Sequence, residues 1–198
     1  MPTLCFGGSF NPIHFGHLLC AEAVAKSAGF EQILLIPSAQ PPHKPNATDL
    51  APAEDRLAMC RLAAADDPLF AVSDIETRRG GPSYTIDTAA ELKQQGFVTV
   101  HWLIGADMLM FLPHWHRAAD LIRQVDFIVM ARPGWTIDWS ALPEEFRGLR
   151  SHMVAAPLID ISATEIRRRV REGRPIDDLV PAAVAAYIAE HMLYRTVG

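Results

Sequence analysis

The chain has 198 residues, of which 49 % are hydrophobic and 21 % are charged, and its formal net charge is −5. This composition is typical of a globular domain and excludes a disordered, collagen-like or coiled-coil protein. The acidic balance also argues against a protein that coats nucleic acid or an anionic membrane, because both partners reward an excess of Lys and Arg.

Short apolar runs alternate with longer amphipathic segments along the chain. The predicted strands are residues 3–6, 32–36, 70–72, 98–104, 126–130 and 152–155, and the predicted helices are residues 17–28, 53–65, 83–95, 118–124, 162–172 and 181–191. Several strands are apolar on both faces, as buried parallel strands are. The pattern predicts a single α/β domain over residues 1–198. We expect a doubly wound, mostly parallel sheet with a small helical appendage at about residues 162–198.

Ligands of such sheets bind beyond the carboxyl ends of the strands, near the point where the strand order reverses. The segments that follow the predicted strands have unusual compositions: GGSFNPIHFGH, IPSAQPPHK, GADM, ARPGW and, further from its strand, DISATEIRRR. We therefore look for the site in these segments.

The sequence carries no sign of export or of a membrane span. Cys5, Cys20 and Cys60 show no CxxC spacing, which favours buried thiols in a reducing compartment. The first residues lack a basic and apolar leader, and no apolar run approaches the roughly 20 residues that cross a bilayer. We expect a cytoplasmic protein.

The segment of residues 7–17 follows the first strand and opens a helix. Gly7 and Gly8 are expected to let the backbone turn sharply and let a ligand approach closely. The helix N-terminus suits a phosphate, and His14 and His17 can lie on one side of the first turn and donate to it. The alternatives are a plain Gly-rich turn with two incidental histidines and a zinc site. HExxH, the Walker A pattern and GxGxxG are all absent from the sequence.

The proline-rich segment of residues 37–52 contains a stiff Pro41-Pro42 pair just before His43 and Lys44. Stiff prolines would hold this basic tip over a pocket, as a lid does in phosphate chemistry. The alternative is an exposed connector.

Two further segments follow the fourth strand. Asp107, just after that strand, is suited to hold a ribose hydroxyl or a metal, or to cap a helix. Trp115 is suited to stack on a flat heteroaromatic ring, or to pack in the core.

The segment of residues 160–169 reads as a helix start, with Ser162 as the N-cap and Glu165 completing a capping box. The arginines that follow oppose the helix dipole, so an anion would stabilise them. Ser162, Thr164 and Arg167 could form a polyphosphate cradle. Arg168 and Arg169 fit the alternative of a solvated basic face.

Taken in order, these segments resemble the bacterial nicotinate mononucleotide adenylyltransferases, members of the HxGH nucleotidyltransferase superfamily. Residues 7–17 match the GG[ST]F[DN]PxHxGH form of the signature. The other matching segments are residues 41–44, 82–85, 105–107, 112–115, 132–134 and 161–167. The resemblance runs from the first strand to the last helices.

The resemblance implies a Rossmann-like nucleotidyltransferase fold and the reaction of ATP with nicotinate mononucleotide. The products would be deamido-NAD and pyrophosphate, in NAD biosynthesis. It also implies Mg²⁺ bound mainly through the ATP phosphates, no protein metal site and no covalent enzyme intermediate. The mononucleotide phosphate would attack the α-phosphorus in line.

Residue roles are carried over position by position. The implied catalytic residues are His14, His17, Lys44 and Arg167. The implied ATP-binding residues are Gly8, Ser9, Phe10, His14, His17, Gly105, Asp107, Arg132, Ile161, Ser162, Thr164 and Arg167. The implied nicotinate mononucleotide-binding residues are Ser9, Phe10, Lys44, Tyr84, Thr85, Trp115 and His116.

The chain departs from the family pattern at three positions. Ser9 replaces the commoner Thr, Asn11 replaces the commoner Asp, and His116 stands where Tyr is frequent. The alternatives left open are the nicotinamide mononucleotide as substrate, another HxGH transferase, and a nucleotide sensor without turnover. A homo-oligomer also stays open, and no nucleic-acid partner is expected.

Overall fold

The structure is a computed structural model that describes residues 1–42, 48–131, 134 and 136–195. Its strands form one parallel sheet in the order β3-β2-β1-β4-β5-β6. The strands are β1 Thr3–Gly8, β2 Gln32–Pro37, β3 Phe70–Val72, β4 His101–Gly105, β5 Asp126–Ala131 and β6 Met153–Ala155. This order confirms the predicted doubly wound sheet and places the switch point between β1 and β4.

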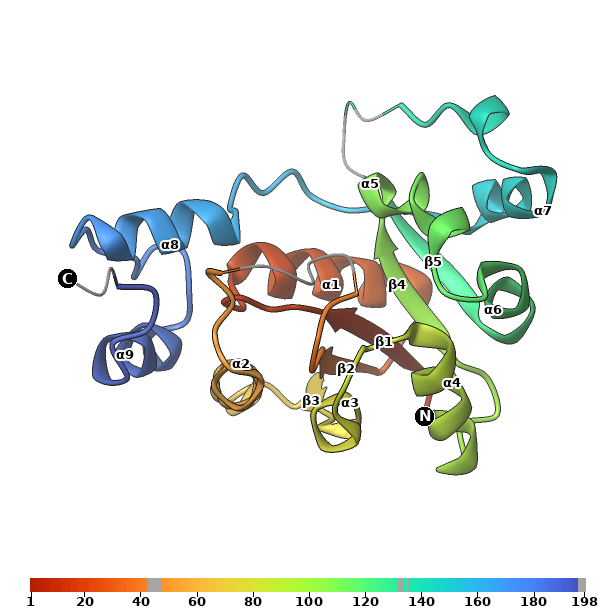
Figure 1. The fold of residues 1–198 in the computed structure, drawn as a ribbon. Coiled ribbons are helices and arrows are strands. Elements are labelled where there is room, and N and C mark those ends of the chain that lie inside the picture. Colours follow the sequence, from red (N-terminus) through yellow and green to blue (C-terminus); the bar gives the residue numbers. More distant parts are fainter. Residues whose placement is uncertain (43–47, 132–133, 135, 196–198) are drawn as a thin grey trace.

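Helices connect the strands and cover both faces of the sheet. They are α1 Phe15–Ala28, α2 Ala53–Ala64, α3 Ile75–Arg79, α4 Thr85–Gln94, α5 Ala106–Leu109, α6 Ala118–Gln124, α7 Glu144–Arg147, α8 Ala163–Arg171 and α9 Ala182–Glu190. Short 3-10 helices are Leu112–His114, Trp139–Ala141 and Gly148–His152. In Figure 1 the blue helices α8 and α9 lie at one end of the molecule with the C-terminus, and α6 and α7 lie at the other.

The strands are buried on both faces, as their apolar composition predicts. In β1, Leu4 joins a core cluster with α1, α2, α8 and α9, whereas Cys5 joins a second cluster with α4 and α6. Ile33 and Leu34 of β2 divide between the two clusters in the same way. Alternate side chains along one strand point to opposite faces, so a strand buried twice must be apolar throughout.

The structure differs from the prediction at the start of one strand and in three short helices. The fourth strand was expected from residue 98 but begins at His101, and Val98 is 96 % exposed. The sequence analysis also missed α3, α5 and α7, which have only four or five residues. So few residues complete little more than one turn, so they cannot show a helical period.

The C-terminal helices share the core with the sheet. Ile166 of α8 and Val184 and Ile188 of α9 are buried in the same cluster as Leu4 and Phe10. The Tyr187 hydroxyl of α9 donates to Asp55 Oδ1 of α2 at 2.8 Å. The helical appendage is therefore fastened to the sheet by packing and by hydrogen bonds. None of the helices in the described part of the chain is long and apolar enough to cross a bilayer.

Candidate active site

A cavity opens at the switch point of the sheet. β1 pairs with β4 only at Leu4↔His101 and Cys5↔Trp102, whereas it pairs with β2 along its whole length. Beyond this short pairing lies a cavity of about 260 Å³. Its lining residues are Phe6, Gly7, Gly8, Ser9, Ser38, Pro41, Pro42, Glu76, Ser83, Thr85, Trp102, Leu103, Ile104, Gly105, Met108 and Trp115. The predicted segments after β1, β2 and β4 thus meet at one place.

The glycines after β1 make room for side chains. A Cβ on Gly7 would overlap Cζ2 of Trp102, and a Cβ on Gly8 would lie 3.1 Å from the Phe10 ring. The expectation that these glycines turn the chain is wrong, because both lie within β1. The left-handed residue is Phe10, with φ of 42°, and its ring is buried in the core. The turn is therefore held by packing of Phe10.

The two predicted histidines stand together at the start of α1. His14 is the N-cap residue of the helix, and His17 lies in the first turn. Their rings stack with centroids 3.7 Å apart, and His17 also meets the edge of Phe10 at 5.2 Å. His14 is buried and His17 is half-buried. The prediction that they share one side of the helix start is confirmed.

The C-terminal segment reaches this same turn. Arg167 Nη1 of α8 donates to the backbone oxygen of Asn11 at 2.9 Å. A Cβ on Gly16 would lie 3.4 Å from the backbone oxygen of Ile161. The first and last predicted segments, about 150 positions apart in the sequence, therefore lie side by side.

Arg167 has a carboxylate partner in this arrangement. Its Nε donates to Asp49 Oδ2 at 2.9 Å. Partial burial acts to raise the pKa of the Asp49 carboxyl, but the hydrogen bond and charge of Arg167 outweigh it, so this pKa lies below its ordinary value. The guanidinium that would meet phosphate is thus already paired with an anion.

The start of α8 follows the prediction in part. Ser162 Oγ accepts from the backbone N–H of Glu165 at 3.2 Å, which confirms the N-cap. The Glu165 carboxylate is bound by Arg168 and Arg169 instead of completing the capping box. Arg168 and Arg169 also pair with Glu172 and Asp178. These two arginines therefore form the surface face that was the alternative, and Ser162 and Thr164 lie exposed beside Arg167.

Aromatic side chains gather around the cavity. Trp115 lines it and meets the edge of Phe127 at 6.4 Å. Tyr84 and His116 stack on each other with centroids 4.2 Å apart. His116 thus keeps an aromatic contact although it replaces the commoner Tyr. Thr85, next to Tyr84, lines the cavity as well.

Gly105 and Asp107 lie where β4 passes into α5. Gly105 is the N-cap residue of this helix, so the alternative of Asp107 as the cap is wrong. Asp107 is exposed, and its Oδ1 occupies the place that a Cβ of Gly105 would take. The carboxylate is therefore free of the core and lies beside the cavity wall. Lys44 and Arg132 lie outside the described residues.

Sequence reasoning missed a buried cation behind the site. Arg56 is fully buried and donates to three backbone oxygens: Ala51 at 2.9 Å, Ser9 at 2.7 Å and Ala39 at 2.9 Å. Burial lowers the pKa of its guanidinium. The only signal was an arginine next to Leu57 in a stretch that is otherwise buried. Arg56 fixes the turn after β1 relative to the segment after β2.

Two polar residues in the cavity wall, Glu76 and Ser38, were also not predicted from the sequence. Glu76 is 4 % exposed and accepts from Thr88 Oγ1 at 2.6 Å. Burial raises the pKa of the Glu76 carboxyl, and hydrogen bonds from Thr88 and Ser83 oppose this. Ser38 Oγ is buried and makes no hydrogen bond to any described residue. No spacing in the sequence marks Glu76, because its partner Thr88 comes from another helix, and nothing in the sequence near Ser38 marks its place in the cavity wall.

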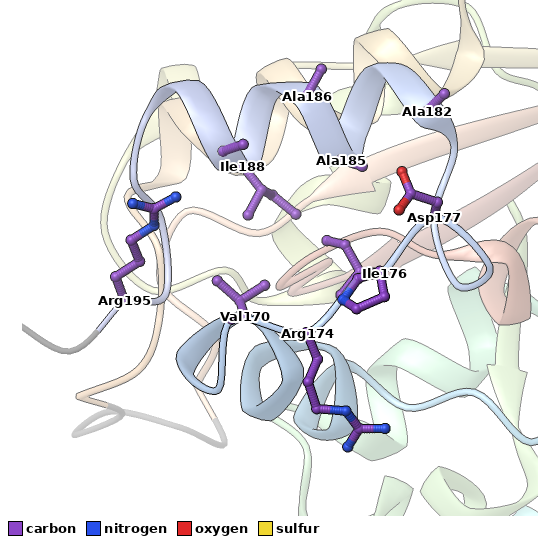
Figure 2. A pocket seen from close by; sticks show the side chains of 12 residues that line it. Val170, Arg174, Ile176, Asp177, Ala182, Ala185, Ala186, Ile188 and Arg195 are labelled. Atoms are coloured by element: carbon purple, nitrogen blue, oxygen red, sulfur yellow. The ribbon is translucent and has the colours of Figure 1, made fainter.

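Two further features bear on where the site lies. Over the described ranges, no group of three or more His, Cys, Asp or Glu side chains is placed to hold a metal. A larger hollow of about 410 Å³ lies between α8 and α9, where Figure 2 shows Val170, Ile176 and Ile188 between Arg195 and Asp177. It contains none of the predicted site residues, so the switch-point cavity is the better candidate.

Comparison with known proteins gives a consistent result. Residues 5–169 match the family model described as cytidylyltransferase-like. A probable nicotinate-nucleotide adenylyltransferase of Herpetosiphon aurantiacus is 47 % identical over 191 residues, covering 95 % of this chain and 96 % of the relative. One from Roseiflexus sp. is 44 % identical and covers 98 % of each chain. The Plasmodium falciparum nicotinic acid mononucleotide adenylyltransferase complexed with NaAD superposes with a TM-score of 0.74 at 20 % identity, over 98 % of each chain. This last likeness concerns the fold.

Proposed function

The chain belongs to the nicotinate-nucleotide adenylyltransferases within the cytidylyltransferase-like family, and we propose that it joins ATP to nicotinate mononucleotide. The products are deamido-NAD and pyrophosphate, a step of NAD biosynthesis. The phosphate of the mononucleotide attacks the α-phosphorus of ATP in line, and pyrophosphate leaves. Such transfers depend on positioning and charge stabilisation, so no protein nucleophile is needed.

We assign two parts to the site. The phosphate end consists of the turn and helix start at residues 9–17 together with Ser162, Thr164 and Arg167. The ring end is the 260 Å³ cavity at the switch point. Each part suits one chemistry, since the phosphate end is polar and the ring end is walled largely by apolar and aromatic side chains.

At the phosphate end, His14 and His17 bind the ATP phosphates, and His17 faces the phosphate that is transferred. The start of α1 adds backbone N–H groups and the positive end of the helix dipole. Gly8, Ser9 and Phe10 lie against the nucleotides with their backbone. Arg167, Ser162 and Thr164 hold the β and γ phosphates, where charge builds up as pyrophosphate leaves. By resemblance, Ile161 lies beside ATP as well.

At the ring end, Trp115 stacks on the pyridine ring, which is the contact its indole can make at the cavity wall. Thr85 and the backbone N–H of His116 donate to the nicotinate carboxylate, and Tyr84 supports His116 by stacking. Gly105 and Asp107 contact the adenosine ribose, for which the exposed carboxylate beside the cavity is a suitable acceptor.

Three further assignments rest on the resemblance, as that of Ile161 does. Lys44 binds phosphate, Arg132 lies on the adenine side, and Mg²⁺ enters with ATP. Because the described residues offer no cluster of metal ligands, the ATP phosphates would hold the ion, which neutralises their charge. We place the protein in the cytoplasm, for which the three buried cysteine thiols are suited.

One observation carries the proposal. The HxGH segment and the helix of Arg167 lie together, with the Arg167 guanidinium 2.9 Å from the backbone oxygen of Asn11. A triphosphate that lies on His17 is therefore within reach of a second cation from the far end of the sequence. Had the two segments faced separate surfaces, the histidines would have no partner for a polyphosphate.

The test is pyrophosphate release with ATP and nicotinate mononucleotide. His17→Ala should reduce turnover by at least roughly 100-fold, the effect of removing one preorganised charge-stabilising group. The control is His101→Ala, at the amino end of β4 and so at the opposite edge of the sheet, which should keep wild-type turnover. Wild-type turnover in His17→Ala would remove this residue from the mechanism.

Substrate competition addresses the alternatives. Nicotinamide mononucleotide should be the poorer substrate, because an amide presents an NH₂ group to donors meant for a carboxylate. CTP in place of ATP should give little product. A preference for the amide or for CTP would overturn the assignment, and binding of ATP without any release would identify a sensor.

A further inference from the structure

The end of the chain returns to the candidate site. After α9 the backbone turns through Met192 and Tyr194, whose φ angles are 51° and 62°. These left-handed conformations are unfavourable for residues with a side chain, so tertiary contacts must hold them. The contact in question is the Tyr194 hydroxyl, which donates to Asn11 Oδ1 at 2.9 Å. This bond joins two residues that are 183 positions apart.

Asn11 is a junction of several segments. It is 6 % exposed, and its Nδ2 donates to the backbone oxygen of Asp49 at 2.8 Å. Its Oδ1 accepts from the backbone N–H of Ala51 at 3.0 Å as well as from Tyr194. The amide is thus used as donor and acceptor at once, which an ionised Asp at this position could not do. The departure from the commoner Asp therefore fits these partners.

The same residue holds the phosphate end. The backbone oxygen of Asn11 accepts from Arg167 Nη1, and the next Arg167 contact is the Asp49 carboxylate. Arg56 holds the same turn by donating hydrogen bonds to the backbone oxygens of Ser9 and Ala51. A rotation of the Asn11 side chain would therefore release the backbone of Ala51 and Asp49, and the turn whose Asn11 backbone oxygen binds Arg167 would be less firmly held.

The Tyr194 hydroxyl is suited to hold that side chain still. Burial raises its pKa, and the nearby charges of Arg167 and Arg56 only partly oppose this. The hydroxyl therefore stays protonated at neutral pH and keeps its role as donor. Arg195, the next residue, lies at the end of the groove between α8 and α9 (Figure 2).

We propose that Tyr194 is a positioning residue for ATP binding, which fixes Asn11 and through it the guanidinium of Arg167. The inference rests on the proposed function, in which Arg167 holds the β and γ phosphates. It assigns to the last turn of the chain a part in the site, although Tyr194 itself touches no reacting group.

Tyr187 provides a matched control within the same C-terminal segment. Its hydroxyl also fastens this segment to the body of the protein, by donating to Asp55 Oδ1 at 2.8 Å. Among the described residues, Asp55 makes no side-chain hydrogen bond to the turn of residues 9–11. Tyr194→Phe and Tyr187→Phe therefore each delete one hydroxyl bond of the appendage, but only the first bond ends at the phosphate end.

The kinetic test compares the two variants. Tyr194→Phe should raise KM for ATP by about 3–10-fold, the effect of one hydrogen bond, with little change in kcat or in KM for nicotinate mononucleotide. Tyr187→Phe should leave all three constants at wild-type values. An equal effect of both variants, or none on KM for ATP in Tyr194→Phe, would overturn the proposal.

Hydrogen exchange gives a readout that does not depend on activity. The backbone N–H of Ala51 donates to Asn11 Oδ1, so its exchange should speed up in Tyr194→Phe and not in Tyr187→Phe. If exchange at Ala51 were faster in Tyr194→Phe but the wild-type protein had no turnover, the proposed function would be refuted, and the role of Tyr194 in fixing Asn11 would stand. Unchanged exchange at Ala51 would refute that role.

Discussion

The phosphate end and the ring end of the site are held together by different forces. At the phosphate end, single hydrogen bonds join residues that are far apart in the sequence, as Arg167 and Tyr194 do with Asn11. The ring end is held by close packing, as where the Trp102 ring fills the space beside Gly7. The first end should therefore be sensitive to the loss of a polar atom, and the second to a gain in volume.

Arg56 connects the two ends of the site, and its substitution should have the largest effect. Arg56 binds the backbone oxygens of Ser9 at the phosphate end and of Ala39, whose own N–H donates to Ser83 in the cavity wall. Arg56→Met keeps much of the volume but leaves three buried or partly buried backbone oxygens without their donor. We expect a loss of about 3–5 kcal/mol in the free energy of unfolding, measured with urea.

Arg61→Met is the control for that change. Arg61 lies on the same helix, is exposed, and pairs with the Asp74 carboxylate at 3.4 Å. Its loss should stay within about 0.5 kcal/mol. If Arg56→Met lowered the free energy of unfolding by no more than Arg61→Met, the two ends would not depend on Arg56.

A gain in volume should disturb the ring end alone. In Gly7→Ala the new methyl group would overlap the Trp102 ring, and because the φ of Gly7 is not left-handed, the penalty is one of space. We expect a loss of about 1–3 kcal/mol in stability and a rise of KM that is larger for nicotinate mononucleotide than for ATP, of which only the ribose is assigned to the ring end, at Gly105 and Asp107. Urea unfolding and initial rates measure both.

Gly148→Ala tests whether any added methyl group would do the same. A Cβ there meets nothing within 4 Å, and the φ of Gly148 is −58°. The variant should be as stable as the wild type, or more stable by up to about 1 kcal/mol. A rise of KM for ATP in Gly7→Ala equal to that for the mononucleotide would contradict the separation of the two ends.

The sequence predicted what depends on neighbouring residues. The apolar runs of β1 and β2 revealed strands buried on both faces, and Ser162 was recognised as an N-cap because its partner lies three positions on. The stacked His14 and His17 follow from helical spacing in the same way. Local periodicity and capping are properties of the chain itself, and they survive in the fold.

What the sequence could not reveal depends on residues brought together by the sheet. Glu76 meets Thr88 across the α3–α4 connection, and Tyr194 meets Asn11 only because α9 packs beside α2. Even at the glycines, the sequence indicated small residues without showing that Trp102 needs the space. No spacing rule within one segment predicts a partner that comes from another.

The buried carboxyl of the ring end should make stability depend on pH. Burial raises the pKa of Glu76 above its ordinary value of 4.5. The folded state therefore binds this proton more tightly than the unfolded state does, so the carboxyl favours folding fully below pH 4.5. That contribution is lost as the pH rises through the folded pKa, with a slope of at most about 1.4 kcal/mol per pH unit.

Glu76→Gln should remove this part of the pH dependence. The stability of wild type relative to the variant should then fall as the pH rises above 4.5, as measured by urea unfolding at each pH. Thr88→Val deletes the donor that favours the charged form, so it should extend the decline to higher pH. A constant difference between wild type and Glu76→Gln would show that Glu76 has the same pKa in both states.

The smallest expected effect concerns the carboxylate that occupies Arg167 at the phosphate end. Asp49 is half exposed, so its ion pair with Arg167 is worth little, but a triphosphate must compete with it for the same guanidinium. Asp49→Asn should therefore lower KM for ATP by about 2–5-fold at low salt, and less as salt is added.

Because the pKa of Asp49 lies below its ordinary value, the carboxylate is fully charged above pH 6, and the ratio of KM values between wild type and Asp49→Asn should not vary between pH 6 and 9. Asp177→Asn removes the same charge from the hollow between α8 and α9 (Figure 2), which contains no predicted site residue, and should leave KM for ATP unchanged. If both variants lowered KM equally, the effect would come from net charge, and the competition at Arg167 would be refuted.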